Sequence, residues 1–174
     1  MALARPITSS EMSLQRVAAS RTAQERFDDY LQSRGMRGTQ QRRVLLQLVS
    51  EQQHHFDAEQ LLAQLPRRGQ SGYVSRPTVY RTLAEFVDAG LLRKLELGGR
   101  SVYEHDYGYP PHDHMHCQQC GRLYEFQSDE LGELVADIAR LNGFVQAGHK
   151  LIIEGTCREC RQQQRRQRKR VDLI

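Results

Sequence analysis

Four cysteines form two identical Cys-x-x-Cys pairs in the last third of the chain, Cys117 with Cys120 and Cys157 with Cys160. One such turn places two thiolates on an edge of a tetrahedron, and a second turn supplies the opposite edge. The spacing therefore predicts a closed structural Zn2+ site whose binding free energy stabilises the fold. Disulfides and a thioredoxin-like redox pair are the alternatives.

A second group of metal-binding residue types is scattered along the chain. In an extended stretch, His112, His114 and His116 share one face and Asp113 lies on the other. Imidazoles combined with carboxylates suit Fe(II), Mn(II), Zn or Ni. The pattern indicates either a second metal site or a histidine cluster without a ligand. Further donors of the same types are Glu104, Glu125, His54 and His55.

The first hundred residues read as helices followed by a hairpin. Apolar spacing and the N-cap residues Thr39, Asp57 and Ser75 predict helices over 23–34, 40–52, 58–65 and 76–89. Two strands, 91–97 and 100–105, flank Gly98-Gly99 and predict a β-hairpin. Helices followed by a hairpin make a winged helix-turn-helix domain.

The fourth predicted helix has a face suited to a DNA major groove. Its apolar stripe is predicted to contain Val79, Leu83, Phe86 and Val87. We expect Glu85 to point away from that stripe. An outward face of this kind can contact bases and phosphates, although a merely solvated face is the alternative. The predicted DNA contacts are Arg37, Arg42, Arg76, Thr78, Tyr80 and Arg81.

The remaining chain predicts a smaller α/β unit. Strands at 114–117 and 122–126 precede a helix that is capped by Ser128 and ended by Gly143. A strand over 144–155 then leads into the second cysteine pair. Because neither this unit nor the first is large enough for a generous core, we expect cross-links or association with another chain. The fold class is therefore α+β.

Charge and composition divide the chain further. Residues 21–100 hold 13 Lys and Arg against 9 Asp and Glu, whereas residues 101–160 hold 4 against 10. A polyanion partner for the first half and a cation for the second would explain this asymmetry. Chance asymmetry between two solvated faces is the alternative. Residues 1–20 and the basic residues 161–174 are expected to be flexible tails. No apolar run reaches a membrane-spanning length and residues 1–20 lack a secretory signal, so we expect a cytoplasmic protein.

Several motifs, taken in their order along the chain, resemble those of the ferric uptake regulator (Fur) family of metal-dependent transcriptional repressors. They span about residues 22–160 and are specific in combination. The matching pieces are His54-His55 before Ala58-Glu59, Ser75-Arg-Pro-Thr-Val-Tyr-Arg-Thr-Leu83, Asp88-Ala-Gly-Leu91, Ser101-Val-Tyr-Glu104, His112-Asp113-His114, Cys117-x-x-Cys120-Gly121, Glu125-Phe126 and the final cysteine pair.

The resemblance implies a homodimer with a winged-helix domain at 21–106 and a metal-binding dimerisation domain at 107–160. It implies a regulatory metal at the hinge between the domains and an AT-rich palindromic DNA operator near iron-uptake genes. Tyr80 matches the family's base-contacting tyrosine, and Arg81 matches its phosphate-contacting arginine. The regulatory ligands carried over by motif are His55, Glu104, His112, His114 and Glu125.

The chain departs from the family pattern at an auxiliary metal site. Asp113 and His149 match two of its ligands, but Pro111 and Gly132 stand where the family has His and Glu. At the regulatory site, three imidazoles and two carboxylates favour Fe2+, with Mn2+ or Zn2+ as alternatives. Open alternatives are a peroxide-, zinc- or manganese-responsive regulator, a mononuclear metalloenzyme, and a zinc-stabilised interaction module without a regulatory metal. Because no nucleophile, glycine-rich loop or substrate-binding cluster accompanies these ligands, we expect that the chain is not an enzyme.

Overall fold

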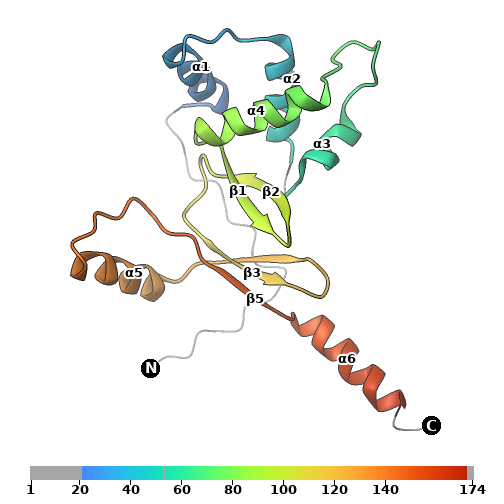
Figure 1. The fold of residues 1–174 in the computed structure, drawn as a ribbon, viewed down its shortest axis with the longest axis vertical. Coiled ribbons are helices and arrows are strands. Elements are labelled where there is room, and N and C mark those ends of the chain that lie inside the picture. Colours follow the sequence, from blue (N-terminus) through green and yellow to red (C-terminus); the bar gives the residue numbers. More distant parts are fainter. Residues whose placement is uncertain (1–20, 53, 172–174) are drawn as a thin grey trace. The chain divides into compact units, whose positions relative to one another are not determined.

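The computed structural model describes residues 21–52 and 54–171, with side chains to residue 167. These residues form two compact units that divide between Pro110 and Pro111 (Figure 1). The predicted N-terminal tail, residues 1–20, lies outside the described residues. Within the described ranges, no helix is long and apolar enough to cross a membrane.

The first unit holds four helices and a two-stranded sheet. Thr22, Thr39 and Asp57 begin three of the helices, and each side chain accepts a backbone hydrogen bond as an N-cap should. Ser75 begins the fourth helix without such a bond, because its hydroxyl pairs with that of Thr78 at 2.8 Å. The elements are α1 (Ala23–Ser33), α2 (Gln40–Ser50), α3 (Ala58–Gln64), α4 (Arg76–Asp88), β1 (Leu92–Leu97) and β2 (Arg100–His105).

Helix α4 lies at the centre of this unit's core. Its residues Val79, Leu83 and Phe86 are fully buried, as the apolar spacing predicted. Phe86 meets Phe27 of α1 edge to face, with ring centroids 4.8 Å apart. The buried stripe fixes which side of α4 is left for solvent.

The hairpin β1–β2 turns at the two predicted glycines. Gly98 and Gly99 have φ of 55° and 79°, the left-handed values that a two-residue type I′ turn requires. On the other edge of β2, Phe56 and Tyr103 exchange backbone hydrogen bonds of 3.0 and 2.7 Å. The connection between α2 and α3 is thereby held against the hairpin.

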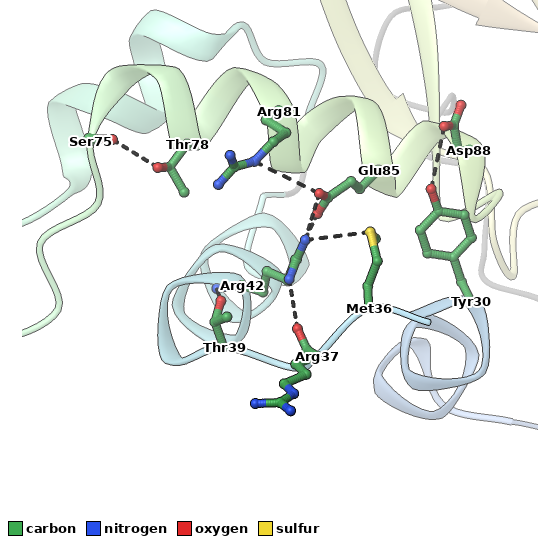
Figure 2. A network of polar contacts seen from close by, with 10 residues as sticks. All are labelled: Tyr30, Met36, Arg37, Thr39, Arg42, Ser75, Thr78, Arg81, Glu85 and Asp88. Carbon is green, nitrogen blue, oxygen red and sulfur yellow. Dashed lines mark hydrogen bonds and ion pairs between the residues drawn. The ribbon is translucent and has the colours of Figure 1, made fainter. Parts of the chain in front are cut away.

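A buried ion pair joins α2 to α4 (Figure 2). Arg42 donates to both carboxylate oxygens of Glu85, at 2.7 and 2.8 Å, and to the carbonyl of Arg37 at 2.7 Å. Both side chains are largely buried, at 14% and 10% exposure. The structure therefore corrects one expectation, since Glu85 does not point outward, and it places the predicted DNA contact Arg42 in an ion pair within the protein.

The second unit is a three-stranded sheet with two helices. Its elements are β3 (Asp113–Cys117), β4 (Leu123–Phe126), α5 (Asp129–Leu141), β5 (Ile152–Gly155) and α6 (Arg158–Val171). The strand order is β4-β3-β5, with β3 antiparallel to β4 and parallel to β5. The middle strand β3 therefore carries a neighbour on each edge.

Three predictions differ from the structure by more than two residues. Residues 106 and 107 donate to the carbonyl of Leu91, so the connection after the hairpin stays with the first unit. Of the predicted strand 144–155, only residues 152–155 form a strand, which pairs with residues 114–117 of β3. The expected flexible tail is helical up to Val171, since Arg, Gln and Lys are good helix formers and the segment lacks Gly and Pro.

Replacing either member of the Arg42–Glu85 pair should destabilise the first unit. Arg42→Ala or Glu85→Ala leaves a buried charge without its partner, and each should lower the free energy of unfolding by about 3 kcal/mol. Urea denaturation followed by circular dichroism measures this loss. The neighbouring exposed Arg43→Ala is the control and should change stability by less than about 0.5 kcal/mol. Strict additivity in the double variant would contradict a direct interaction.

Candidate metal centres and DNA-binding surface

The four cysteines gather at one end of β3. The register pairs Cys117 with Gly155, so the loop after β5 meets the turn after β3. The four sulfur atoms all lie within 4.8 Å of one another, and the sulfurs of Cys120 and Cys157 are 3.9 Å apart. A tetrahedral Zn2+ with Zn–S bonds of about 2.3 Å needs sulfurs about 3.8 Å apart. The cluster is therefore a zinc-type site with four cysteine ligands, called the four-cysteine site below.

The electrostatics of these thiols also suit a cation. The backbone N–H of Cys157 donates to the sulfur of Cys117 at 3.2 Å, and this bond lowers the pKa of that thiol. The pKa of Cys160 is raised, first by its contact with the thiol of Cys157 and then by burial. A second thiolate is thus disfavoured among these sulfurs unless a positive ion compensates the charge. All four cysteines are free rather than disulfide-bonded.

In the first unit, His55 and Glu104 form a pair. Because Phe56 bridges Tyr103 in antiparallel fashion, the preceding residue His55 faces the following residue Glu104. The Nε2 atom of His55 lies 2.7 Å from a carboxylate oxygen of Glu104. Two of the five predicted regulatory ligands are therefore assembled by the fold of this unit itself.

In the second unit, His114 lies on β3, Glu125 lies on β4, and His112 lies directly before β3. His114 is the direct cross-strand partner of Glu125, so their side chains share a face of the sheet. The rings of His112 and His114 meet edge to face with centroids 4.9 Å apart. The sheet thus presents two imidazoles and one carboxylate from adjacent positions.

The opposite face of β3 holds the two residues assigned to an auxiliary site. The Nε2 atom of His149 lies 2.9 Å from one carboxylate oxygen of Asp113, and the other oxygen accepts a 2.9 Å bond from the N–H of Leu151. Asp113 and His149 are therefore already hydrogen-bonded to each other. Of the further histidines, His116 lies 4.0 Å from Glu154, and His105 bonds the carbonyl of Gln52 at 3.0 Å.

The outward side of α4 carries exposed cations and one exposed tyrosine. Arg76, Tyr80 and Arg81 have exposed side chains, and Thr78 is half-buried beside Ser75. Figure 2 shows Arg81 on this helix and the Arg37 guanidinium directed away from the Arg42–Glu85 pair. Except for Arg42, the predicted DNA contacts therefore remain accessible.

Sequence reasoning missed the role of Glu59 on this surface. Its carboxylate pairs with the guanidinium of Arg76 and accepts a 3.0 Å hydrogen bond from the hydroxyl of Tyr80. These contacts lower the pKa of Glu59, the bond from Arg76 most strongly. The Ala58-Glu59 match was a signal in the sequence, but nothing in it indicated contact with α4.

Helix α5 leaves its apolar side uncovered. None of its residues is buried, although the predicted helical spacing of apolar residues is present. Leu134 and Ile138 are more than half exposed. The same unit exposes Leu141, Phe144 and Val145, at 77%, 69% and 92%. Exposed apolar side chains in this number are typical of a surface that another chain covers.

Comparison with known proteins places these features in a family. Residues 33–154 match the model of the ferric uptake regulator family. The ferric uptake regulation protein of Campylobacter jejuni is 32% identical over 139 residues, which cover 80% of this chain and 88% of that protein.

Two solved structures show the same fold. The ferric uptake regulator of Pseudomonas aeruginosa with manganese has a TM-score of 0.63 at 29% identity, covering 75% of this chain and 97% of that one. That of Francisella tularensis with iron has a TM-score of 0.62 at 29% identity, covering 73% and 96%.

The site and the fold together define a metal-responsive DNA-binding regulator with a winged helix and a small α/β dimerisation domain. The chain belongs to the ferric uptake regulator family. Members of this family are transcription factors and act as DNA-binding dimers, so the metalloenzyme alternative is set aside.

Loss of one thiol should disrupt the four-cysteine site. Cys160→Ser removes a thiolate ligand and is expected to reduce bound zinc and to lower the melting temperature of the second unit by about 10 °C or more. Metal analysis of the purified chain and thermal unfolding measure both effects. Gln163→Ala, at an exposed position of α6 outside the cluster, is the control and should leave both unchanged. A fully zinc-loaded, equally stable Cys160→Ser protein would refute the assignment.

Proposed function

We propose that the chain is a cytoplasmic Fe(II)-responsive repressor of iron-uptake genes. The unit that ends at Pro110 would bind an AT-rich palindromic operator, and the unit that begins at Pro111 would form the homodimer, while one metal joins the two. The observation that carries the proposal is that each unit preassembles its share of the ligands. His55 and Glu104 are paired in one unit, and His114 faces Glu125 in the other.

The donor set suits a divalent transition metal. Three imidazoles and two carboxylates match the preferences of Fe2+, Mn2+ and Zn2+ better than those of Ca2+ or a soft metal. The solved relatives contain manganese in one case and iron in the other, so peroxide-, zinc- or manganese-responsive regulation is the second candidate. Relative affinity alone does not select iron, because Zn2+ binds most such sites more tightly.

The protein's own residues prepare the regulatory site. The hydrogen bond between His55 and Glu104 holds both donors in place, and a divalent cation would replace the proton that they share. A cation that also takes His112, His114 and Glu125 binds most tightly when the two units adopt one arrangement. It can favour DNA binding only through that difference in affinity, and a coupling of about 1–3 kcal/mol is typical.

The apolar side of α5 supplies the dimer contact in this proposal. A second copy of the chain would cover Leu134, Ile138 and Leu141, which are exposed in the single chain. A two-fold axis through this surface would present two copies of α4, in keeping with a palindromic operator. Arg37, Arg76, Thr78, Tyr80 and Arg81 would then contact DNA from each copy.

Operator binding should require the regulatory metal. Anisotropy titrations of labelled operator fragments with Mn2+ as an air-stable substitute for Fe2+ are expected to show tight binding, lost on chelation of the weakly held metal. In His112→Ala/His114→Ala, metal-stimulated affinity should fall at least about tenfold, corresponding to about 1.4 kcal/mol. Zinc in the four-cysteine site should be retained, as metal analysis will verify. Equal affinity with and without Mn2+ would favour the interaction module instead.

Substitutions on α4 should alter DNA affinity without altering metal binding. Tyr80→Phe removes a hydroxyl that could reach a base, and Arg81→Ala removes a phosphate contact, so each should weaken operator binding by about 1–3 kcal/mol. Glu59→Gln should strengthen it, because a carboxylate that competes with phosphate for Arg76 is removed. Arg43→Gln removes one exposed positive charge from α2 and is the control for the change in net charge. Unchanged affinity in all three variants would contradict this surface.

A further inference from the structure

Helix α6 is the most strongly basic element of the protein. Its fourteen residues include one acidic side chain, Glu159, and seven basic residues. The Glu159 carboxylate accepts a 3.1 Å hydrogen bond from Tyr124. The basic residues are Arg158, Arg161, Arg165, Arg166, Arg168, Lys169 and Arg170.

The helical form arranges part of this charge along one side. Arg158, Arg161 and Arg165 are three and four residues apart, so they follow one another on the same side of the helix. Cys160 and Gln164 lie on a different side, where Cys160 joins the thiol cluster and Gln164 donates to Gln119 at 3.3 Å. The side that anchors α6 is therefore not the side that carries this row of arginines.

These positive charges are available to a partner. Arg161, Arg165 and Arg166 are exposed. Within residues 21–52 and 54–167, no carboxylate forms an ion pair with them. Figure 1 shows α6 continuing beyond β5 as a single extended helix. Concentrated cations without internal counter-charges attract a polyanion.

We propose that α6 is a second DNA-contacting element, which binds the phosphate backbone of duplex DNA without reading its sequence. A helix of fourteen residues is about 21 Å long, a length of duplex that carries about twelve phosphate charges. A membrane surface suits α6 less well, because its residues offer Gln rather than an apolar face opposite the arginines. The proposal rests on duplex DNA as the partner and is independent of the regulatory metal.

The salt dependence of DNA binding tests this role. The zinc-loaded full chain and Arg161→Gln/Arg165→Gln/Arg166→Gln are titrated with a duplex of random sequence at several KCl concentrations and without added Mn2+. Gln preserves the helix, as circular dichroism will verify. Each lost phosphate contact lowers the slope of log K against log salt by about 0.9, so the triple variant should show a slope shallower by about 2–3 for each chain that contacts the duplex.

A charge-matched variant separates position from net charge. Arg122→Gln/Arg140→Gln/Lys150→Gln removes three cations from the same unit outside α6, and its slope should change by less than about 1. Equal slopes for the wild type and the α6 variant, or equal losses in both variants, would overturn the proposal. So would binding of the wild type to vesicles of phosphatidylglycerol as tight as to duplex, lost together with duplex binding in the α6 variant.

This test does not depend on the outcome for the proposed regulatory function. Failure of that function appears as operator binding that does not respond to Mn2+, whereas failure here appears as an unchanged salt slope on random duplex. As a second check, Arg81→Ala should still lose affinity for random duplex when the three α6 arginines are replaced. Identical affinity of that combined variant and Arg81→Ala alone would argue against an independent contact by α6.

Discussion

The pairing of β3 with both of its neighbours is the constraint on which the second unit depends. Its five residues align Cys117 with the loop that holds the second cysteine pair, and they align His114 with Glu125. On the opposite face of β3, Asp113 contacts His149. Because side chains alternate along a strand, one register places three sets of metal-binding residue types at once. A slip by a single residue would separate all of them.

In the first unit, a single backbone bridge likewise positions two residues of metal-binding types. The exchange of hydrogen bonds between Phe56 and Tyr103 brings His55 and Glu104 together. The Arg42–Glu85 pair then holds α2 against α4, whose outward side carries the exposed Arg76 and Arg81. Arginines that look alike in the sequence thus differ in the structure, since Arg42 is buried in an ion pair whereas Arg76 and Arg81 are exposed.

Local signals predicted much of this fold. Cap residues and apolar spacing located α1 to α4, Gly98-Gly99 located the hairpin, and the cysteine spacing predicted the four-cysteine site. Tertiary pairings left no such signal: Arg42 meets a carboxylate 43 positions away, and Glu59 reaches across to α4. The strand before the second cysteine pair is short because its hydrogen-bonding partner is short. Residues 161–174 are too polar to form a core, and this composition predicts a flexible tail. A segment can nevertheless be helical without a core, because helix propensity does not depend on burial.

Cys160 belongs both to the thiol cluster and to the first turn of α6. A helix of this composition has no apolar face to hold it, so its N-terminal turn would ordinarily fray in water. Because Cys160 attaches this turn to the four-cysteine site, helix formation in α6 depends on whether that site holds a metal ion. The far-ultraviolet ellipticity of the C-terminal segment is therefore expected to decrease together with the sheet in a single cooperative transition when the thiols lose their ion.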